Sequence, residues 1–432
     1  MMLTTIFFLI IGLIIISGIS FTALKDINNM KSLLSGKVSF YVSEAGMEDA
    51  LYRIKNVIQI TNNTISIDGN FSAITLQDNG NGTITVLSEA STSDFYKRIQ
   101  ANVVSGSGIS FHYGIQAGNG GFVLDNSSNI TGNVYSNGSV IGLSKNDIYG
   151  DVISSGSNGL VFGFHATGSV YSHIIGSSTQ NATTIDKDAY YQTITTNTSV
   201  SGTKHSGSAD QPTIPLPISD QKIQEWEKDA LAGGIMNSSE CDDYDSRSKT
   251  CTISENRTLG PKKIPFNLSI KNSSNKNKTL TVTGALWIVG NLDVSGQPTI
   301  QMSPNLGSTN IAIIADDPSN RSEGSMVTLG NGATFLGSGF PRSYVFIISQ
   351  NNSAENGGST IAINPQQSAS ALVVYASHGL IEMSQTVGVK EVTAYKISLS
   401  QSANVTYDTG LASTIFSSGP AGGFNIIDWT EI

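Results

Sequence analysis

The residues that could carry acid, base or metal chemistry are few and scattered. The Asp-Asp doublets are Asp242-Asp243 and Asp316-Asp317, and the second precedes Pro318 in what we interpret as a solvated turn. The histidines show neither an H-E-x-x-H motif nor the paired spacing of metal ligands. We therefore expect no catalytic residue, no cofactor and no metal site. The five histidines are His112, His165, His173, His205 and His378.

One enzymatic alternative stays open at this stage. Some enzymes built on parallel β-helices cleave polysaccharides with clustered carboxylates, which bind calcium or act as acid and base. A hydrolase or lyase of envelope polysaccharide is therefore the alternative function. Three or more carboxylates converging in an exposed groove would favour this enzyme, whereas a smooth surface of Asn, Ser and Thr would favour a binding protein.

The only two cysteines are Cys241 and Cys251. Two thiols without a nearby histidine do not make a zinc site. In an exported chain they are expected to form a disulfide that closes the loop 242–250, and the alternative is two reduced thiols.

Composition points away from nucleic acid and towards a β-rich body. Charged residues are 13% of the 432 residues, against roughly 25% in a typical domain, and there are 44 glycines. The formal net charge is −9. Because binding to phosphates needs clustered cations and no basic patch is visible, nucleic acid is excluded as a partner.

The first residues form the strongest local signal. Residues 3–24 contain no charge and are mostly apolar, and Lys25 and Asp26 end the run. A helix of this length, at roughly 1.5 Å per residue, is long enough to cross a bilayer. A cleaved signal peptide is the rival interpretation, but no Lys or Arg precedes the run. We predict a single membrane span over 3–24, with the rest of the chain extracytoplasmic.

The stretch after the span continues the helical spacing to about residue 58. Residues 40–51, which include Glu44, Ala45, Asp49 and Ala50, resemble the A-x-E-A-x-x-x-D-A segment that follows the membrane span of PilX-type minor pilins. The resemblance implies a helix whose apolar half packs into a filament core or the inner membrane. It also implies that other pilins are partners.

The start of the chain departs from that family. Type IV prepilins carry a short basic leader that ends in Gly, whereas this chain opens Met1-Met2-Leu3. Two expectations follow: either the true start lies upstream, or the protein remains an unprocessed membrane anchor.

Residues 106–185 contain an internal repeat. The pattern Gly-x-Val recurs at a constant spacing in the segments 132–136, 150–154 and 168–172. A fixed step with one aliphatic residue at the same place predicts stacked rungs with an internal ladder. We predict a parallel β-helix (solenoid), and the alternative is a β-sandwich. The ladder residues are Val134, Val152 and Val170.

We expect five segments along the chain. Residues 1–60 form the pilin-like helix, 61–105 a small β-hairpin region and 106–185 the first β-helix segment. Residues 186–255 hold a linker, a short helix capped by Ser219 and the cysteine loop, and 256–432 form the second β-helix segment. This last segment is similar to the β-helical ectodomains attached to PilX-like helices, and loosely to bactofilins.

The expected fold is thus mainly β: a solenoid body behind a long N-terminal helix. The expected function is that of a non-enzymatic cell-surface protein, a minor pilin or pilin-like anchor for pilus assembly or adhesion. Besides the membrane and other pilins, its candidate partners are a surface polysaccharide and a neighbouring or host cell. We also expect the helix to tether the β body without contributing to its fold.

Overall fold

The structure is a computed structural model that describes residues 2–55, 64–78, 83–92, 95–105, 113–272, 278–307, 309–330, 332–340, 343–366, 372–384, 388–407 and 424–431. The chain divides into two compact units. Unit 1 consists of Met1–Gly106 and Gly423–Ile432, and unit 2 of Ser107–Gly422. Unit 2 is therefore inserted into the chain of unit 1.

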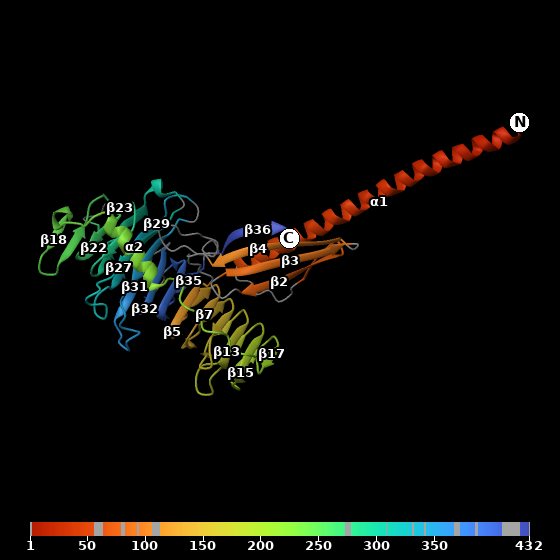
Figure 1. Cartoon of the computed structure of the whole chain (residues 1–432). Helices are drawn as coiled ribbons and strands as arrows, with labels where there is room; N and C mark the ends of the chain where they lie inside the picture. The colour runs from red at the N-terminus through yellow and green to blue at the C-terminus, as the bar shows by residue number, and fades with distance from the viewer. Residues whose placement is uncertain are drawn as a thin grey trace. The chain divides into compact units, whose positions relative to one another are not determined.

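Unit 1 begins with one long helix, α1 (Met2–Lys55), drawn in red in Figure 1. Its apolar N-terminal part is exposed on all sides, with Phe8 72% and Phe21 74% exposed. Within the described residues it is the one helix long and apolar enough to cross a membrane. The predicted continuous helix is present as far as Lys55, and the last expected residues, 56–58, lie outside the described residues.

A five-stranded antiparallel sheet completes unit 1. Its order is β1-β2-β3-β4-β36, so the C-terminal strand pairs with β4. The hairpin expected in 61–105 is part of this sheet, although its turn residues 79–82 lie outside the described residues. The expected segment 256–432 is wrong at its end, because the last strand belongs to unit 1. The strands are β1 (Thr64–Ile67), β2 (Asn70–Asp78), β3 (Thr83–Thr92), β4 (Phe95–Ser105) and β36 (Phe424–Glu431).

The C-terminal half of α1 is part of the core of unit 1. Met47 and Ala50 are fully buried against apolar side chains of the sheet, among them Val86. The hydroxyl of Ser43 donates to the carbonyl of Ser88 at 2.7 Å, and the hydroxyl of Ser88 donates back to the carbonyl of Ser43 at 2.7 Å. The expectation that the helix is only a tether is therefore wrong. A single sheet must cover its apolar face with another element, and α1 does so here.

Unit 2 is a solenoid of parallel strands. Along its first half, successive rungs pair in register: Val152 pairs with Val134 on one side and with Val170 on the other. All three side chains are fully buried in the core. The strands of this half are β5 (Ile115–Leu124), β6 (Asn129–Thr131), β7 (Val134–Ser136), β8 (Val140–Gly142), β9 (Asp147–Tyr149), β10 (Val152–Ser154), β11 (Leu160–Phe162), β12 (His165–Ala166), β13 (Val170–Ile175), β14 (Thr183–Ile185), β15 (Ala189–Ile194), β16 (Thr198–Val200) and β17 (Lys204–Ser206).

The repeat also places short polar residues, directly after the repeated glycines, at one corner of the coil. The side-chain oxygen of Asn133 accepts a hydrogen bond from the backbone N–H of Asp151, 18 residues on, at 2.9 Å. The carboxylate of Asp151 in turn accepts from the N–H of Ser169 at 2.7 Å, again 18 residues on. The short polar residues that follow Gly132 and Gly150 thus each accept a backbone N–H of the next rung where the chain turns.

The second half of the solenoid stacks directly on the first. Strand β34 pairs with β5 and β35 pairs with β6, so one continuous core runs through both halves. In Figure 1, β18 and β17 mark opposite ends of the stack, with β5 between them. The strands of this half are β18 (Asp243–Asp245), β19 (Thr250–Ile253), β20 (Arg257–Leu259), β21 (Lys262–Ile264), β22 (Asn267–Lys271), β23 (Thr279–Val282), β24 (Leu286–Ile288), β25 (Leu292–Ser295), β26 (Thr299–Met302), β27 (Ile311–Ala315), β28 (Val327–Leu329), β29 (Thr334–Leu336), β30 (Val345–Ser349), β31 (Ile361–Pro365), β32 (Leu372–Ser384), β33 (Gly388–Val389), β34 (Glu391–Ser400) and β35 (Asn404–Thr406).

The linker between the halves runs back along the outside of the stack. Its carbonyls accept hydrogen bonds from outward-facing side chains, from Asn137 to Ile214 at 2.7 Å and from Gln116 to Pro215 at 3.2 Å. Helix α2 (Asp220–Ala232) follows, begins after the cap Ser219 as predicted, and packs Trp226 against β27, β30 and β32. Two short 3-10 helices, η1 (Ser238–Glu240) and η2 (Pro304–Leu306), complete the elements described.

Candidate functional site

The pilin-like segment of α1 lies where the helix meets the sheet of unit 1. Ala50 is fully buried, whereas Glu44, Ala45 and Asp49 are half-buried. Asp49 forms an ion pair with Arg53, one turn later, at 2.6 Å. The motif therefore has both a packing side and a polar side, as expected where a helix leaves its apolar stretch and joins a folded head.

Gly46 explains how closely the helix approaches the sheet. A Cβ at this position would lie 2.3 Å from the hydroxyl of Ser72 and 2.5 Å from that of Ser88. A glycine inside a helix weakens it by about 1 kcal/mol relative to Ala. In the structure the missing side chain leaves space for the serine pair that joins α1 to β2 and β3.

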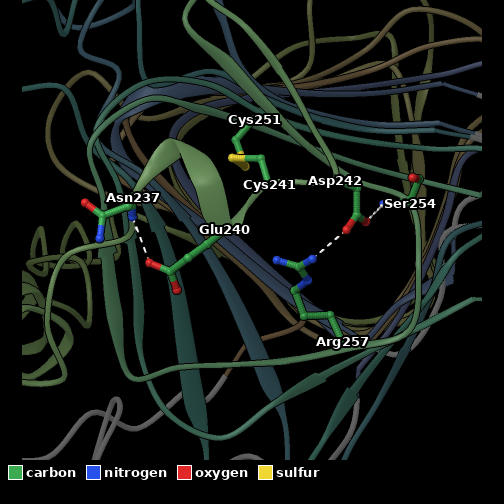
Figure 2. Close-up of a disulfide and its surroundings, with 7 residues drawn as sticks. All are labelled: Asn237, Glu240, Cys241, Asp242, Cys251, Ser254 and Arg257. Atoms are coloured by element: carbon green, nitrogen blue, oxygen red, sulfur yellow. Dashed lines mark hydrogen bonds and ion pairs between the residues drawn. A yellow bond between two sulfur atoms is a disulfide. The ribbon is translucent and has the colours of Figure 1, made fainter.

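Cys241 and Cys251 are joined in a disulfide that fastens one end of the solenoid (Figure 2). The bond closes the antiparallel hairpin β18–β19, in which Tyr244 pairs with Cys251. Beside it, the carboxylate of Asp242 accepts the N–H of Ser254 at 2.7 Å and pairs with Arg257 at 2.5 Å. Strand β18 thus covers the outer side of β19, which pairs with β22 on its inner side.

The histidines of the described residues have carboxylate neighbours rather than a shared metal site. His165 lies between Asp147 and Asp186, with N–O distances of 3.0 and 3.1 Å. His173 pairs with Asp210 at 3.0 Å, so His165 and His173 have separate carboxylate partners. No group of three His, Cys, Asp or Glu side chains in the described part of the chain could hold a metal ion. His112 lies outside the described residues.

His378 links α2 to the solenoid. His378 on β32 contacts Asp220, in the first turn of α2, at 2.9 Å, and Glu355 at 2.5 Å. The hydrogen bond with Asp220 is the main cause of the raised pKa of His378. Burial lowers this pKa, but by less. The contact between His378 and Asp220 therefore links the first turn of α2 to β32.

The expectation of a solvated turn at Asp316 is wrong. The Asp316 side chain is fully buried and receives two hydrogen bonds from the guanidinium of Arg321, at 2.8 and 2.7 Å. Arg321 follows five positions later and folds back over the turn, which removes the carboxylate from water. A buried charge needs such a partner, because its desolvation is otherwise very costly.

Glu227 of α2 lies beside this pair and is only 7% exposed. Burial and the adjacent Asp316 carboxylate raise the pKa of Glu227 to about 8, so it is neutral below that pH. Sequence reasoning missed this residue, although it shares the helix face of Ile223 and Trp226 and that spacing could have revealed it. Covered carboxylates of this kind offer no access to a polymer, so the cluster does not form the exposed groove that the enzymatic alternative requires.

Comparisons with known proteins give little to set beside this geometry. No family model matches the chain, and no curated protein matches it. Among solved structures, the competence-associated pilin ComZ from Thermus thermophilus aligns over 92% of this chain and 97% of its own, with 12% identity and a TM-score of 0.25. At that score the alignment carries no argument about fold or function.

Proposed function

We propose that this chain is a non-enzymatic, membrane-anchored protein of the cell surface, a minor pilin or pilin-like protein that displays a β-solenoid for pilus assembly or adhesion. The single observation that carries the proposal is the division of α1 into two parts. Its N-terminal part is apolar and exposed all round, and its C-terminal part packs into the core of unit 1.

An exposed helix with no polar face is not stable in water, so its surroundings must be apolar. Residues 3–24, at roughly 1.5 Å per residue, match the thickness of a bilayer core of about 30 Å. A filament core built from similar helices would offer the same surroundings. The membrane and other pilins are therefore the partners that suit α1.

The segment around Glu44 and Asp49 supports the narrower assignment to PilX-type minor pilins. The insertion of the solenoid between β4 and β36 also suits a display protein. The strands that flank the insert, β4 and β36, pair with each other in one sheet. The sequence of the insert can therefore change while the sheet of unit 1 stays complete. Adhesion to a surface polysaccharide or to a neighbouring cell is the role we propose for the insert.

Fractionation of cells expressing the full chain tests the anchor. We expect the protein in the membrane fraction, released by detergent but not by high salt. The double substitution Ile10→Lys/Ile14→Lys places two charges in the span at a cost of about 3 kcal/mol each and should shift protein to the soluble fraction.

The matched control is Met30→Lys, which adds a charge to the same helix at a residue that is 70% exposed and lies beyond the predicted span. It should remain in the membrane. Wild-type protein that stays soluble and monomeric without detergent would refute the anchor. Incorporation into a pilus is tested separately: filaments are sheared from the cell surface and probed for this chain.

A further inference from the structure

The first half of the solenoid has a hollow of about 580 Å³ on its surface. It forms because one corner of the coil is shorter than the corners on either side. Strands β11 and β12 are joined by Gly163 and Phe164 alone, whereas the neighbouring rungs turn through residues 143–146 and 176–182. The longer corners stand above the short one and become the walls.

Two glycines make the short corner possible. Gly163 has a φ of +82°, and a Cβ on it would lie 2.0 Å from the carbonyl oxygen of Gly142 on the adjacent rung. The left-handed backbone is strained for a larger residue, and the close approach leaves no space for a side chain. The depth of the hollow is therefore built into the backbone rather than left to the side chains.

The lining combines apolar surface with hydrogen-bonding groups of both kinds. Phe164 lies buried at the floor and Leu143 is 46% exposed. The amide of Asn181 donates to the carbonyl of Leu143, which leaves its side-chain oxygen as an acceptor. The remaining polar side chains of the hollow are Ser144, Lys145, Asn146, Asp147, His165 and Thr184.

The charges in and around the hollow balance. Partial burial lowers the pKa of His165, but hydrogen bonds with Asp186 and Asp147 raise it by more, so the net shift is upward. The protonated His165 donates to both carboxylates, and Lys145 supplies a second positive charge. Among the charged side chains that line the hollow and their ion-pair partners, two cations thus face two anions, so these groups together carry no net charge with which to attract an ion.

Lys145 has a φ of +44°, a left-handed conformation that is uncommon for a residue with a long side chain. Such outliers cluster at ligand clamps and active sites. Among the described residues, no ion pair engages its ammonium group, and Lys145 is one of the residues that line the hollow. An unpaired donor of this kind is ready to bind a ligand oxygen.

We propose that this hollow binds a neutral saccharide. A pyranose ring presents an apolar C–H face that suits Leu143, and hydroxyl groups that suit the mixed donors and acceptors around it. Lys145 donates to a hydroxyl or ring oxygen, and the free oxygen of Asp147 accepts from a hydroxyl. The proposal names a ligand for the surface protein proposed above and rests on the solenoid being displayed outside the cell.

The test is calorimetric titration of the full-length protein in a neutral detergent. The probes are three neutral tetrasaccharides, cellotetraose, maltotetraose and tetra-N-acetylchitotetraose, with tetragalacturonate as the acidic comparison. We expect saturable binding of at least one neutral probe and weaker binding of tetragalacturonate. Because the ligand carries no charge, its affinity should change by less than about twofold between low and moderate salt.

Lys145→Asn removes the ammonium while keeping a residue that tolerates positive φ. It should weaken binding of the neutral probe about tenfold, the loss of one hydrogen bond from a charged donor. The matched control is Lys249→Asn, since Lys249 is also exposed and left-handed, with a φ of +48°, but lies on the β18–β19 hairpin. This control should bind as wild type does.

Three outcomes would overturn the proposal: no neutral probe binds, tetragalacturonate binds more tightly than every neutral probe, or Lys145→Asn binds like the wild type. Failure of this kind leaves the membrane fractionation result untouched, so the two proposals can be separated. Release of shorter sugars from a bound probe would support the site and refute the non-enzymatic part of the proposed function.

Discussion

At the scale of single residues, the inward-facing valines of the repeat hold the rungs in register. Val152 has a partner on each side and no access to solvent. Ile153, its neighbour, points the other way and is half-buried. Alternation of this kind is the reason that a period-based prediction succeeds in a solenoid.

We predict that Val152→Asp will destabilise unit 2 by about 3 kcal/mol or more, because it buries an unpaired carboxyl between two rungs. The measurement is the melting temperature of the purified protein, with Ile153→Asp as the control on the outward face. A variant that melts like the wild type would mean that Val152 faces solvent.

Glu227 gives the structure a dependence on pH. Its folded pKa of about 8 lies above the ordinary value of 4.5, so folding retains a proton that the unfolded chain releases. The stabilisation from this group is complete below pH 4.5, is lost as pH rises towards 8, and stays lost above it. The raised pKa of His378 acts in the same direction from its ordinary value of 6.5 upwards.

Glu227→Gln should therefore flatten the decline of unfolding free energy between about pH 5 and pH 8. Denaturant titrations across that range provide the measurement. Glu225→Gln is the control, since Glu225 is on α2 but pairs with Lys222 near the surface. Parallel pH profiles for wild type and Glu227→Gln would show that Glu227 is ionised throughout.

At the scale of elements, two connections decide how the units are built. One is the contact between α1 and the sheet of unit 1, which depends on Gly46 and the serines around it. The other is the hairpin β18–β19 at one end of the solenoid, in which β18 pairs with β19. Without β18, strand β19 would be an open edge of the sheet.

Gly46→Leu should separate α1 from the sheet, because there is no space for a side chain between the helix and Ser72. We expect unit 1 to become sensitive to protease at temperatures where the wild type resists. Gly18→Leu is the matched control: it is in the same helix, and a Cβ there has nothing within 4 Å. Equal resistance of both variants would contradict the packing described.

The Cys241–Cys251 bond should form outside the cytoplasm and stabilise the hairpin. For a loop of this size the chain-entropy estimate is roughly 3 kcal/mol. Mass spectrometry of unreduced, folded protein should show no free thiol, and the double variant Cys241→Ser/Cys251→Ser should unfold at lower denaturant concentration. Two free thiols in folded, exported protein would refute this assignment.

At the scale of the whole molecule, the sequence predicted the helix, the solenoid and the repeat, because each follows from a local period. It did not predict that the last strand returns to the first unit. No repeat in the sequence links Trp429 on β36 to its pairing partner Ala101 on β4. The sequence of β36 shows only the short pattern of a β-strand, which does not identify the strand it pairs with. The closing of the sheet was therefore outside the reach of the sequence.

The candidate site shows the same division. The disulfide pairing was expected from two isolated cysteines, whereas the burial of Asp316 by Arg321 depends on how a turn folds back. The saccharide hollow depends on corner lengths in three successive rungs, which become meaningful only after the rungs are aligned.

The central claim is that α1 holds the chain in a membrane and that the solenoid lies outside it. Labelling of spheroplasts with a membrane-impermeant maleimide tests this directly, using Ser157→Cys on the exposed β10–β11 turn of the solenoid. Thr5→Cys, near the start of α1, is the comparison. The account predicts that Ser157→Cys is labelled in intact spheroplasts and Thr5→Cys only after the membrane has been dissolved in detergent. Labelling of Ser157→Cys that requires lysis would contradict it.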